Sequence, residues 1–125
     1  MTLAARIETI EASYEFMLAY AAQGRVSESG SNPSIRKTLT EMRDAASGLV
    51  DAYRAEVAAF PNALNQFADV LGADMARAVA AIDVALAVPS IGSQLVDNLN
   101  ASVHVRTVLT DLFLIDETIK ALRRN

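Results

Sequence analysis

The stretch ADMARAVAAIDVALAV, Ala73 to Val88, decides the fold class of this chain. Its only polar side chains are Asp74, Arg77 and Asp83. On an α-helix, with about 100° of rotation per residue, Asp74 and Arg77 lie about 60° apart and are placed to form an ion pair, whereas Asp83 lies about 180° from Asp74. Because such a helix has no single polar face, we expect it to be covered on more than one side.

Three arrangements would cover this helix. It could sit centrally, ringed by the other helices, with its alanines allowing close approach. Alternatively, one face could pack inside a helical bundle while another meets a second subunit or a partner protein. A third arrangement is an apolar channel that holds a ligand. The sequence leaves the three open.

Helical spacing of apolar residues extends over the rest of the chain. Two rows step by three and four residues: Leu3, Ile7, Ile10, Tyr14, Met17 and Ala21, then Ile35, Leu39, Met42, Ala46, Leu49, Tyr53, Val57 and Phe60. An average step of about 3.5 residues places each row on one side of a helix, as in near-parallel packed helices. No stretch alternates apolar and polar residues as a half-buried strand does. The sequence therefore predicts an all-α fold.

Turn-forming residues mark where the helices end. Residues 24–33 (GRVSESGSNP) are predicted to form a loop in which Asn32 caps the next helix, with a proline at the first helical position. Pro61 and Pro89 each disfavour helical geometry at the residue before them. Asn62 is placed to cap the helix that follows Pro61.

The remaining boundaries are weaker. A break is expected within residues 98–102, whereas Gly72 alone is not expected to interrupt its helix, since one glycine costs only about 1 kcal/mol relative to alanine. The predicted helices cover residues 2–24, 33–60, 62–88 and 102–123, with a short helix near 90–99. Short connections favour antiparallel neighbours. We therefore expect an up-down four-helix-type bundle with one additional short helix, forming a single domain over residues 1–125.

Bulk composition narrows the class of protein. A chain of 125 residues has the size of one domain and can bury a stable core without disulfide bonds or a structural metal. It contains no cysteine. Its net charge of −4 and its lack of tryptophan argue against a nucleic-acid surface. The amino terminus has no secretory signal pattern, and no apolar run is long enough to span a membrane. We expect a cytoplasmic protein that binds neither nucleic acid nor membranes.

Some large apolar residues fall outside the predicted core rows. Phe16 and Tyr20 stand apart from the row on the first helix, and residues 112–115 (LFLI) cover every direction of one helical turn, leaving Phe113 and Leu114 outside the row on the last helix. Contiguous apolar patches usually mark interfaces. We therefore expect these four residues to contact a partner, most simply a second copy in an isologous homodimer.

His104 is the only histidine and the first candidate for chemistry. A phosphorelay helix usually carries the pattern H-x-x-K-G, but Thr107 and Val108 occupy the two diagnostic positions here. A di-iron bundle requires Glu-x-x-His on two helices, and no glutamate stands three residues before this histidine. On the helical wheel His104 lies near Asp111 and Ile115, at the edge of the apolar row. We expect a rim histidine with a local polar partner, and no metal or other cofactor.

Two carboxylates stand in apolar surroundings. Asp83 lies within the stretch that opens this subsection, and Asp116 lies about 50° from the centre of the apolar row on the last helix. A buried charge is costly unless it is paired or protonated, so each is expected to have a partner, face a wet crevice or lie at a subunit contact. The candidate partners are Arg6, Arg43, Arg54 and Arg106.

No catalytic motif accompanies these residues. The chain lacks G-x-S-x-G, a P-loop, G-x-G-x-x-G and H-E-x-x-H. We therefore expect a non-catalytic interaction protein, an accessory, adaptor or regulatory subunit, that self-associates through apolar helix faces. One alternative is a small-molecule binder with a pocket between helices and Asp83, Asp116 or His104 as its polar anchor. A further alternative is an enzyme that uses acidic residues and His104.

Overall fold

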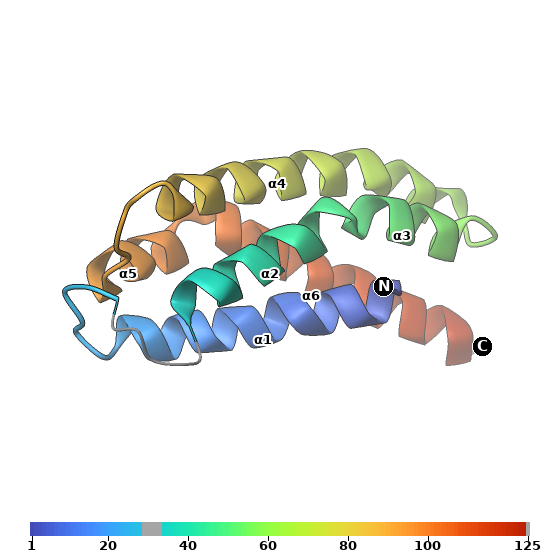
Figure 1. The fold of residues 1–125 in the computed structure, drawn as a ribbon. Coiled ribbons are helices and arrows are strands. Elements are labelled where there is room, and N and C mark those ends of the chain that lie inside the picture. Colours follow the sequence, from blue (N-terminus) through green and yellow to red (C-terminus); the bar gives the residue numbers. More distant parts are fainter. Residues whose placement is uncertain (29–33, 125) are drawn as a thin grey trace.

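The computed structural model describes residues 1–28 and 34–124, and all of its regular elements are helices. In chain order the helices are α1 (Leu3–Ala21), α2 (Ile35–Ser47), α3 (Leu49–Val57), α4 (Asn62–Leu86), α5 (Ser93–Ala101) and α6 (Val103–Arg124). The long segments run alternately in opposite directions, with α2 and α3 together forming the second (Figure 1). The predicted all-α bundle with one short extra helix is therefore confirmed.

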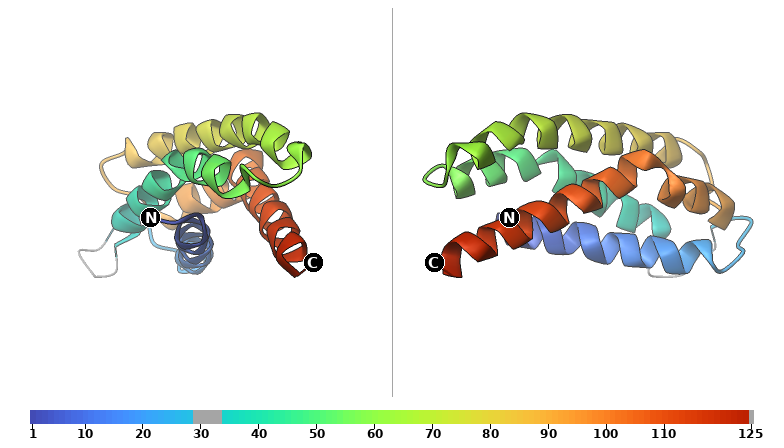
Figure 2. Two further views of the ribbon diagram at one scale, coloured as in Figure 1. Left: turned by 90° about the vertical axis from the view of Figure 1, so that its right-hand side faces the viewer. Right: turned by 180° about the vertical axis from the view of Figure 1, so that it is seen from behind.

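Each long segment packs on the next along the chain. The α2–α3 segment lies against α1, α4 lies against both α2 and α3, and α6 lies against α4. The short α5 packs on α1, α4 and the start of α6 at one end of the bundle. From the α5 end toward the C-terminus, α6 runs progressively away from α1 (Figure 2). Because α4 and α6 lie side by side in contact, their outward sides are adjacent and form one continuous face.

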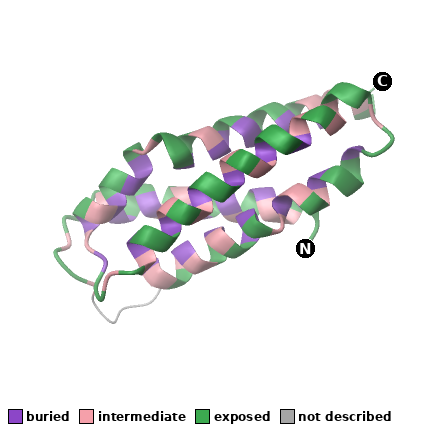
Figure 3. Ribbon diagram, turned by 90° about the horizontal axis from the view of Figure 1, so that it is seen from above, coloured by how far each residue is buried: buried purple, intermediate pink, exposed green. Residues whose placement is uncertain are grey.

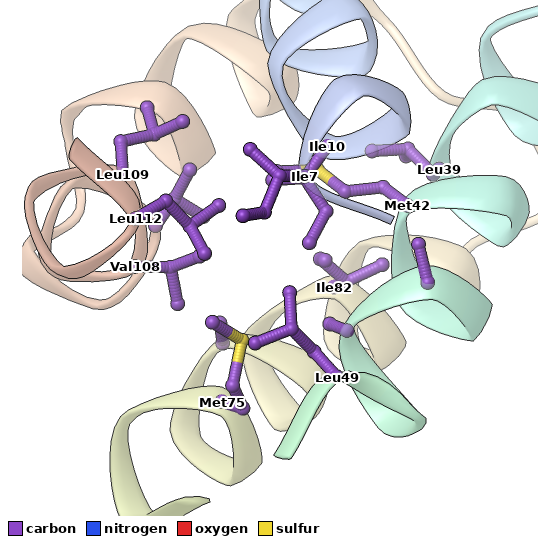
Figure 4. Close-up of a cluster of buried hydrophobic side chains, with 14 of the residues drawn as sticks. Ile7, Ile10, Leu39, Met42, Leu49, Met75, Ile82, Val108, Leu109 and Leu112 are labelled. Carbon is purple, nitrogen blue, oxygen red and sulfur yellow. The ribbon is translucent and has the colours of Figure 1, made fainter. Parts of the chain in front are cut away.

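The core lies between the helices and follows the predicted rows. Buried positions recur every three or four residues along each helix, so that purple bands alternate with exposed ones (Figure 3). Figure 4 shows side chains from five helices meeting in the middle of the bundle: Ile7, Ile10, Leu39, Met42, Leu49, Met75, Ile82, Val108, Leu109 and Leu112. This close packing fixes the positions of the helices that carry the outer face.

The second predicted helix is interrupted at Gly48, which corrects the expectation of one helix over residues 33–60. Gly48 caps the end of α2, and α3 begins directly after it. The guanidinium of Arg6 occupies the space where a Cβ at Gly48 would lie. Its Nη1 donates to the carbonyl oxygens of Asp44 and Ala45, both at 3.2 Å. A side chain from α1 therefore contacts the last turn of α2 at the position where only glycine leaves room for it.

The helix caps differ from the predicted ones. Asn32 lies outside the described residues, and Ser34 caps α2 by accepting a hydrogen bond from the Lys37 N–H at 3.3 Å. Asn62 is the first residue of α4 rather than its cap, which is Pro61. The turn before α4 is held by Asn65, whose side-chain amide donates to the Val57 carbonyl at 3.2 Å. As expected, α4 continues through Gly72 without a break.

Within the described residues, none of the helices combines the length and the apolar character needed to cross a membrane.

Candidate functional site

Helix α4, which contains the stretch quoted first, is not central in the bundle. One side of it is buried, formed by Ala68, Leu71, Met75, Ala78, Ile82 and Ala85. Its opposite side is open, with Val70 exposed by 49% and Val84 by 69%. The arrangement in which other helices ring α4 is therefore wrong, because the chain covers only one side and the flanks. The outward apolar residues have no cover from the described part of the chain.

A second row of residues runs between the open side of α4 and its border with α6. Its members are again three and four residues apart: Ala63, Phe67, Val70, Asp74, Arg77, Ala81 and Val84. The bordering row on α6 consists of His104, Thr107, Asp111, Leu114 and Thr118. We refer to these two rows together as the α4–α6 face. Both rows have the heptad spacing of coiled-coil contact positions, and their members Val70, Val84 and Leu114 remain exposed.

Two apolar grooves lie on the α4–α6 face. The larger, of about 490 Å³, lies near α5 and is lined by Arg77, Ala80, Ala81, Val84, Ala85, Leu95, Asn98, Leu99 and His104. The smaller, of about 170 Å³, lies near the opposite end and is lined by Tyr53, Ala63, Leu64, Phe67, Leu114, Ile115 and Thr118. Concave apolar surfaces of this kind are typical sites for a ligand or for the side chains of a docked helix.

Two carboxyl groups meet between the grooves. The carboxyl groups of Asp74 of α4 and Asp111 of α6 lie close enough to interact, and Asp111 is only 8% exposed. Burial raises the pKa of Asp111 to about 7, and the neighbouring carboxyl of Asp74 contributes to the same shift. Two carboxylates at one site cannot both ionise without repulsion, so the pair shares a proton near neutral pH.

The carboxyl pair is incompletely satisfied. The Oδ2 atom of Asp111 is buried, and the described residues offer it no hydrogen-bond donor. Arg77 lies one turn after Asp74 on α4, and its Nη1 donates to Oδ1 of Asp74 at 3.3 Å, which confirms the predicted ion pair. The Arg77 side chain remains 62% exposed. The centre of the face therefore carries two acidic groups and one accessible cation, with one acidic oxygen unpartnered.

Tyr20 is not a surface contact residue, which corrects its predicted role. It is 6% exposed, and its hydroxyl donates to the Ile91 carbonyl at 2.6 Å. Phe16 is half-buried and stacks on the Tyr20 ring, with centroids 6.5 Å apart. The segment before α5, absent from a helical wheel of α1 alone, covers this side of the helix. The stacked rings of Phe16 and Tyr20 thus stabilise the packing at the α5 end of the bundle.

Phe113 and Leu114 are exposed, by 60% and 56%. Leu114 lines the smaller groove of the α4–α6 face, whereas Phe113, the residue before it on α6, points about 100° away from it. Phe16 lines a different hollow, between α1 and α2. The four predicted contact residues therefore do not form one patch, and of these only Leu114 belongs to the α4–α6 face.

The three residues predicted as polar anchors also lie apart from one another, in different surroundings. Asp83 is exposed rather than set in an apolar surround, and it pairs with Arg43 at 3.2 Å. Asp116 pairs with Lys120 at 2.8 Å, one turn along α6, rather than with any of the arginines considered. Ion pairs as exposed as these contribute little to stability. His104 alone lines a groove of the face, and its expected local polar partner is not found among the hydrogen bonds of the described residues.

Sequence reasoning missed the Asp74–Asp111 pair. The helical wheel predicts Asp74 as half of a surface ion pair and Asp111 only as a neighbour of His104. The available signal is the heptad row on α4, in which Asp74 interrupts mostly apolar residues near the middle of the helix. The described residues hold no group of three or more histidine, aspartate or glutamate side chains arranged for a metal ion.

Comparisons of the chain with protein-family models, with curated proteins and with solved structures find no match.

Proposed function

We propose that this protein is a non-catalytic interaction protein, an accessory or regulatory subunit, that self-associates through the α4–α6 face. The observation that carries the proposal is the pair of neighbouring rows with heptad spacing, whose exposed members include Val70, Val84 and Leu114. Docking a helix surface into such grooves would remove these side chains from water. An isologous contact is the commonest way in which identical chains cover a shared apolar face.

The size of the face suits a dimer. With 25 residues, α4 is about 37 Å long, and two adjacent helices are roughly 20 Å wide. The product is roughly 700 Å² per copy, close to the typical 800 Å² that each partner contributes to a stable interface. The two grooves lie toward the two ends of this area, so both ends offer apolar contact.

Val84→Glu tests this proposal. Val84 is 69% exposed, so the substitution leaves the core intact, but it would place a charge within the contact. We expect the wild-type protein to dimerise at micromolar concentrations in sedimentation velocity and the variant to dissociate with at least about a tenfold higher Kd, because a buried unpaired carboxylate costs more than 1.4 kcal/mol.

Val26→Glu is the matched control. It makes the same change at a residue that is 96% exposed and lies outside the face, so it should dimerise as the wild type does. A wild-type protein that sediments as a monomer at all concentrations, or a Val84→Glu variant that dimerises normally, would show that the α4–α6 face does not mediate self-association.

A small-molecule binder is the second candidate, because the larger groove has a volume within the usual range of ligand pockets. Its lining is apolar apart from Arg77, Asn98 and His104. Native mass spectrometry separates the two candidates. A small molecule bound to a monomeric wild-type protein, and absent from Val84→Glu, would favour the binder, whereas an unliganded dimer would favour self-association.

A further inference from the structure

The α4 row of the α4–α6 face shows the same order of apolar and charged residues when it is followed from either end. From Phe67 to Val84 it consists of two apolar residues, then Asp74 and Arg77, then two apolar residues. The steps between members alternate regularly between three and four. Asp74 is also the central residue of α4, which spans Asn62–Leu86. The row is therefore symmetric about a point between Asp74 and Arg77, near the middle of the helix.

This symmetry has a direct consequence for two antiparallel α4 helices. If a two-fold axis passes between Asp74 and Arg77, each Asp74 lies opposite Arg77 of the second copy. Going outward, Val70 then lies opposite Ala81, and Phe67 opposite Val84, on both sides of the axis. Antiparallel coiled coils form layers of this kind, in which contact positions three and four residues apart meet across the seam. Each layer then holds either two apolar side chains or two opposite charges.

Other pairings of the same row are unfavourable. A parallel pair in register would place Asp74 against Asp74 and Arg77 against Arg77, with like charges in contact. An antiparallel pair displaced by one heptad would place Asp74 opposite Val84 and Arg77 opposite Ala81, leaving both charges desolvated against apolar side chains. The two charges therefore favour one orientation and one register, as a polar residue at a contact position does in coiled coils.

The Asp74–Asp111 carboxyl pair favours the approach of a cation in addition to Arg77 of the same chain. Asp111 adds an acidic group beside Asp74, and no group among the described residues donates a hydrogen bond to its buried Oδ2. The Arg77 guanidinium is held near the axis by its intrachain bond to Asp74, yet 62% of the side chain is accessible. Across a two-fold axis, each copy brings one guanidinium to the two acidic groups of the other.

We propose that the α4–α6 face is occupied by a second copy of this chain, with the two α4 helices antiparallel and Arg77 of each copy paired with the Asp74–Asp111 carboxyl pair of the other. This inference rests on the proposed self-association and adds its geometry and its specificity-determining residues. The apolar layers supply most of the free energy of association, and the charged layer at the centre sets orientation and register.

A mixing experiment with two charge variants tests the register. Arg77→Glu gives a copy with only acidic residues at the centre, and Asp74→Arg gives a copy with two central arginines. Each variant alone should lose at least about tenfold in affinity, since like charges would then meet twice. Mixed in equal amounts, the two should form a heterodimer with an affinity within about tenfold of the wild-type dimer. Circular dichroism checks that both variants remain helical.

Cysteine cross-linking provides a second measurement that does not alter the central charges. The chain has no cysteine, so introduced thiols give an unambiguous result. Val70→Cys mixed with Ala81→Cys should form an intermolecular disulfide, because these positions face each other in the proposed register. Neither variant alone should cross-link, since two copies of one position would lie roughly 16 Å apart along the helices, beyond disulfide reach.

The outcomes separate this inference from the proposed function. A monomeric wild type overturns both. A dimer that Val84→Glu dissociates, but that shows neither heterodimer recovery between the charge variants nor the mixed disulfide, overturns the antiparallel register alone. Recovery on mixing together with the mixed disulfide supports both the second copy as occupant and the pairing of Arg77 with the opposite carboxyl pair.

Discussion

Asp111 occupies a buried position on α6 and yet carries an ionisable group. Its environment raises its pKa from the ordinary value of 3.8 to about 7, chiefly through burial and also through Asp74. The unfolded chain therefore releases this proton near pH 4, whereas the folded chain retains it up to about pH 7. Between these values the folded state binds more protons, so the contribution of Asp111 to the free energy of unfolding decreases as pH rises from about 4 to 7 and is constant at higher pH.

Asp111→Asn should remove this pH-dependent contribution. The amide cannot ionise and can donate to the Asp74 carboxylate, so the variant should be more stable than the wild type at pH 8, by on the order of 1–3 kcal/mol. Near pH 4 the difference should shrink toward zero, because the wild-type carboxyl is then protonated. Urea unfolding at both pH values, in the Val84→Glu background to prevent association, measures the difference.

Asp97→Asn is the control for this prediction. Asp97 is exposed on α5 and should show no comparable stabilisation at pH 8. A difference between Asp111→Asn and its parent that is the same at pH 4 and pH 8 would contradict the raised pKa of Asp111.

At the scale of the helix, the contact between Arg6 and Gly48 explains why α2 and α3 are separate. A Cβ at position 48 would overlap the guanidinium that bonds the carbonyl oxygens of Asp44 and Ala45. An alanine in place of a helical glycine ordinarily stabilises by up to about 1 kcal/mol. At this position the displaced arginine offsets that gain, because its two hydrogen bonds would be lost.

A double-mutant cycle tests this explanation. Gly48→Ala should lower the free energy of unfolding by about 1 kcal/mol in the wild-type chain, yet raise it by up to about 1 kcal/mol in an Arg6→Ala background. Chemical denaturation of the four proteins gives the coupling energy, expected to be 1–2 kcal/mol.

Gly72→Ala serves as the control for the cycle. A Cβ at Gly72 would make an ordinary contact of 3.5 Å with Val50, and the guanidinium of Arg6 is not within 4 Å of it. It should stabilise equally in both backgrounds, by up to about 1 kcal/mol. Equal effects of Gly48→Ala in the two backgrounds would instead show that Arg6 does not determine the break between α2 and α3.

At the scale of the whole molecule, protonation of Asp111 is linked to association. In the proposed dimer, Arg77 of the second copy approaches the carboxyl pair and favours its ionised form, so the pKa of Asp111 should fall when the dimer forms. The dimer then binds fewer protons than two monomers do. Mass action requires that association strengthens as pH rises from about 5.5 to 8.

Sedimentation velocity at these two pH values should therefore show a lower Kd at pH 8, by about three- to tenfold. Asp111→Asn should abolish the difference, because it removes the titrating group. His104→Gln should preserve it, although His104 lies on the same face. Tighter association at acid pH would contradict the approach of a second cation to the carboxyl pair.

Much of the fold follows from local sequence. The apolar rows on α1 and α2–α3 predicted both the helices and their buried sides, and Pro61 and Pro89 predicted two of the turns. The interruption at Gly48 was not predictable in this way, since it depends on Arg6 from another helix. The same is true of Tyr20, whose burial is due to the segment around Ile91.

The sequence by itself determined where the helices form and which side of each is apolar, because both properties depend on residues three and four positions apart. It also encoded the symmetric row on α4 that contains Asp74 and Arg77. Only the tertiary structure decided that this row borders α6 and that Asp111 meets Asp74 there. Helical periodicity gives the direction of each side chain around its own axis, whereas the neighbour it meets depends on how whole helices pack.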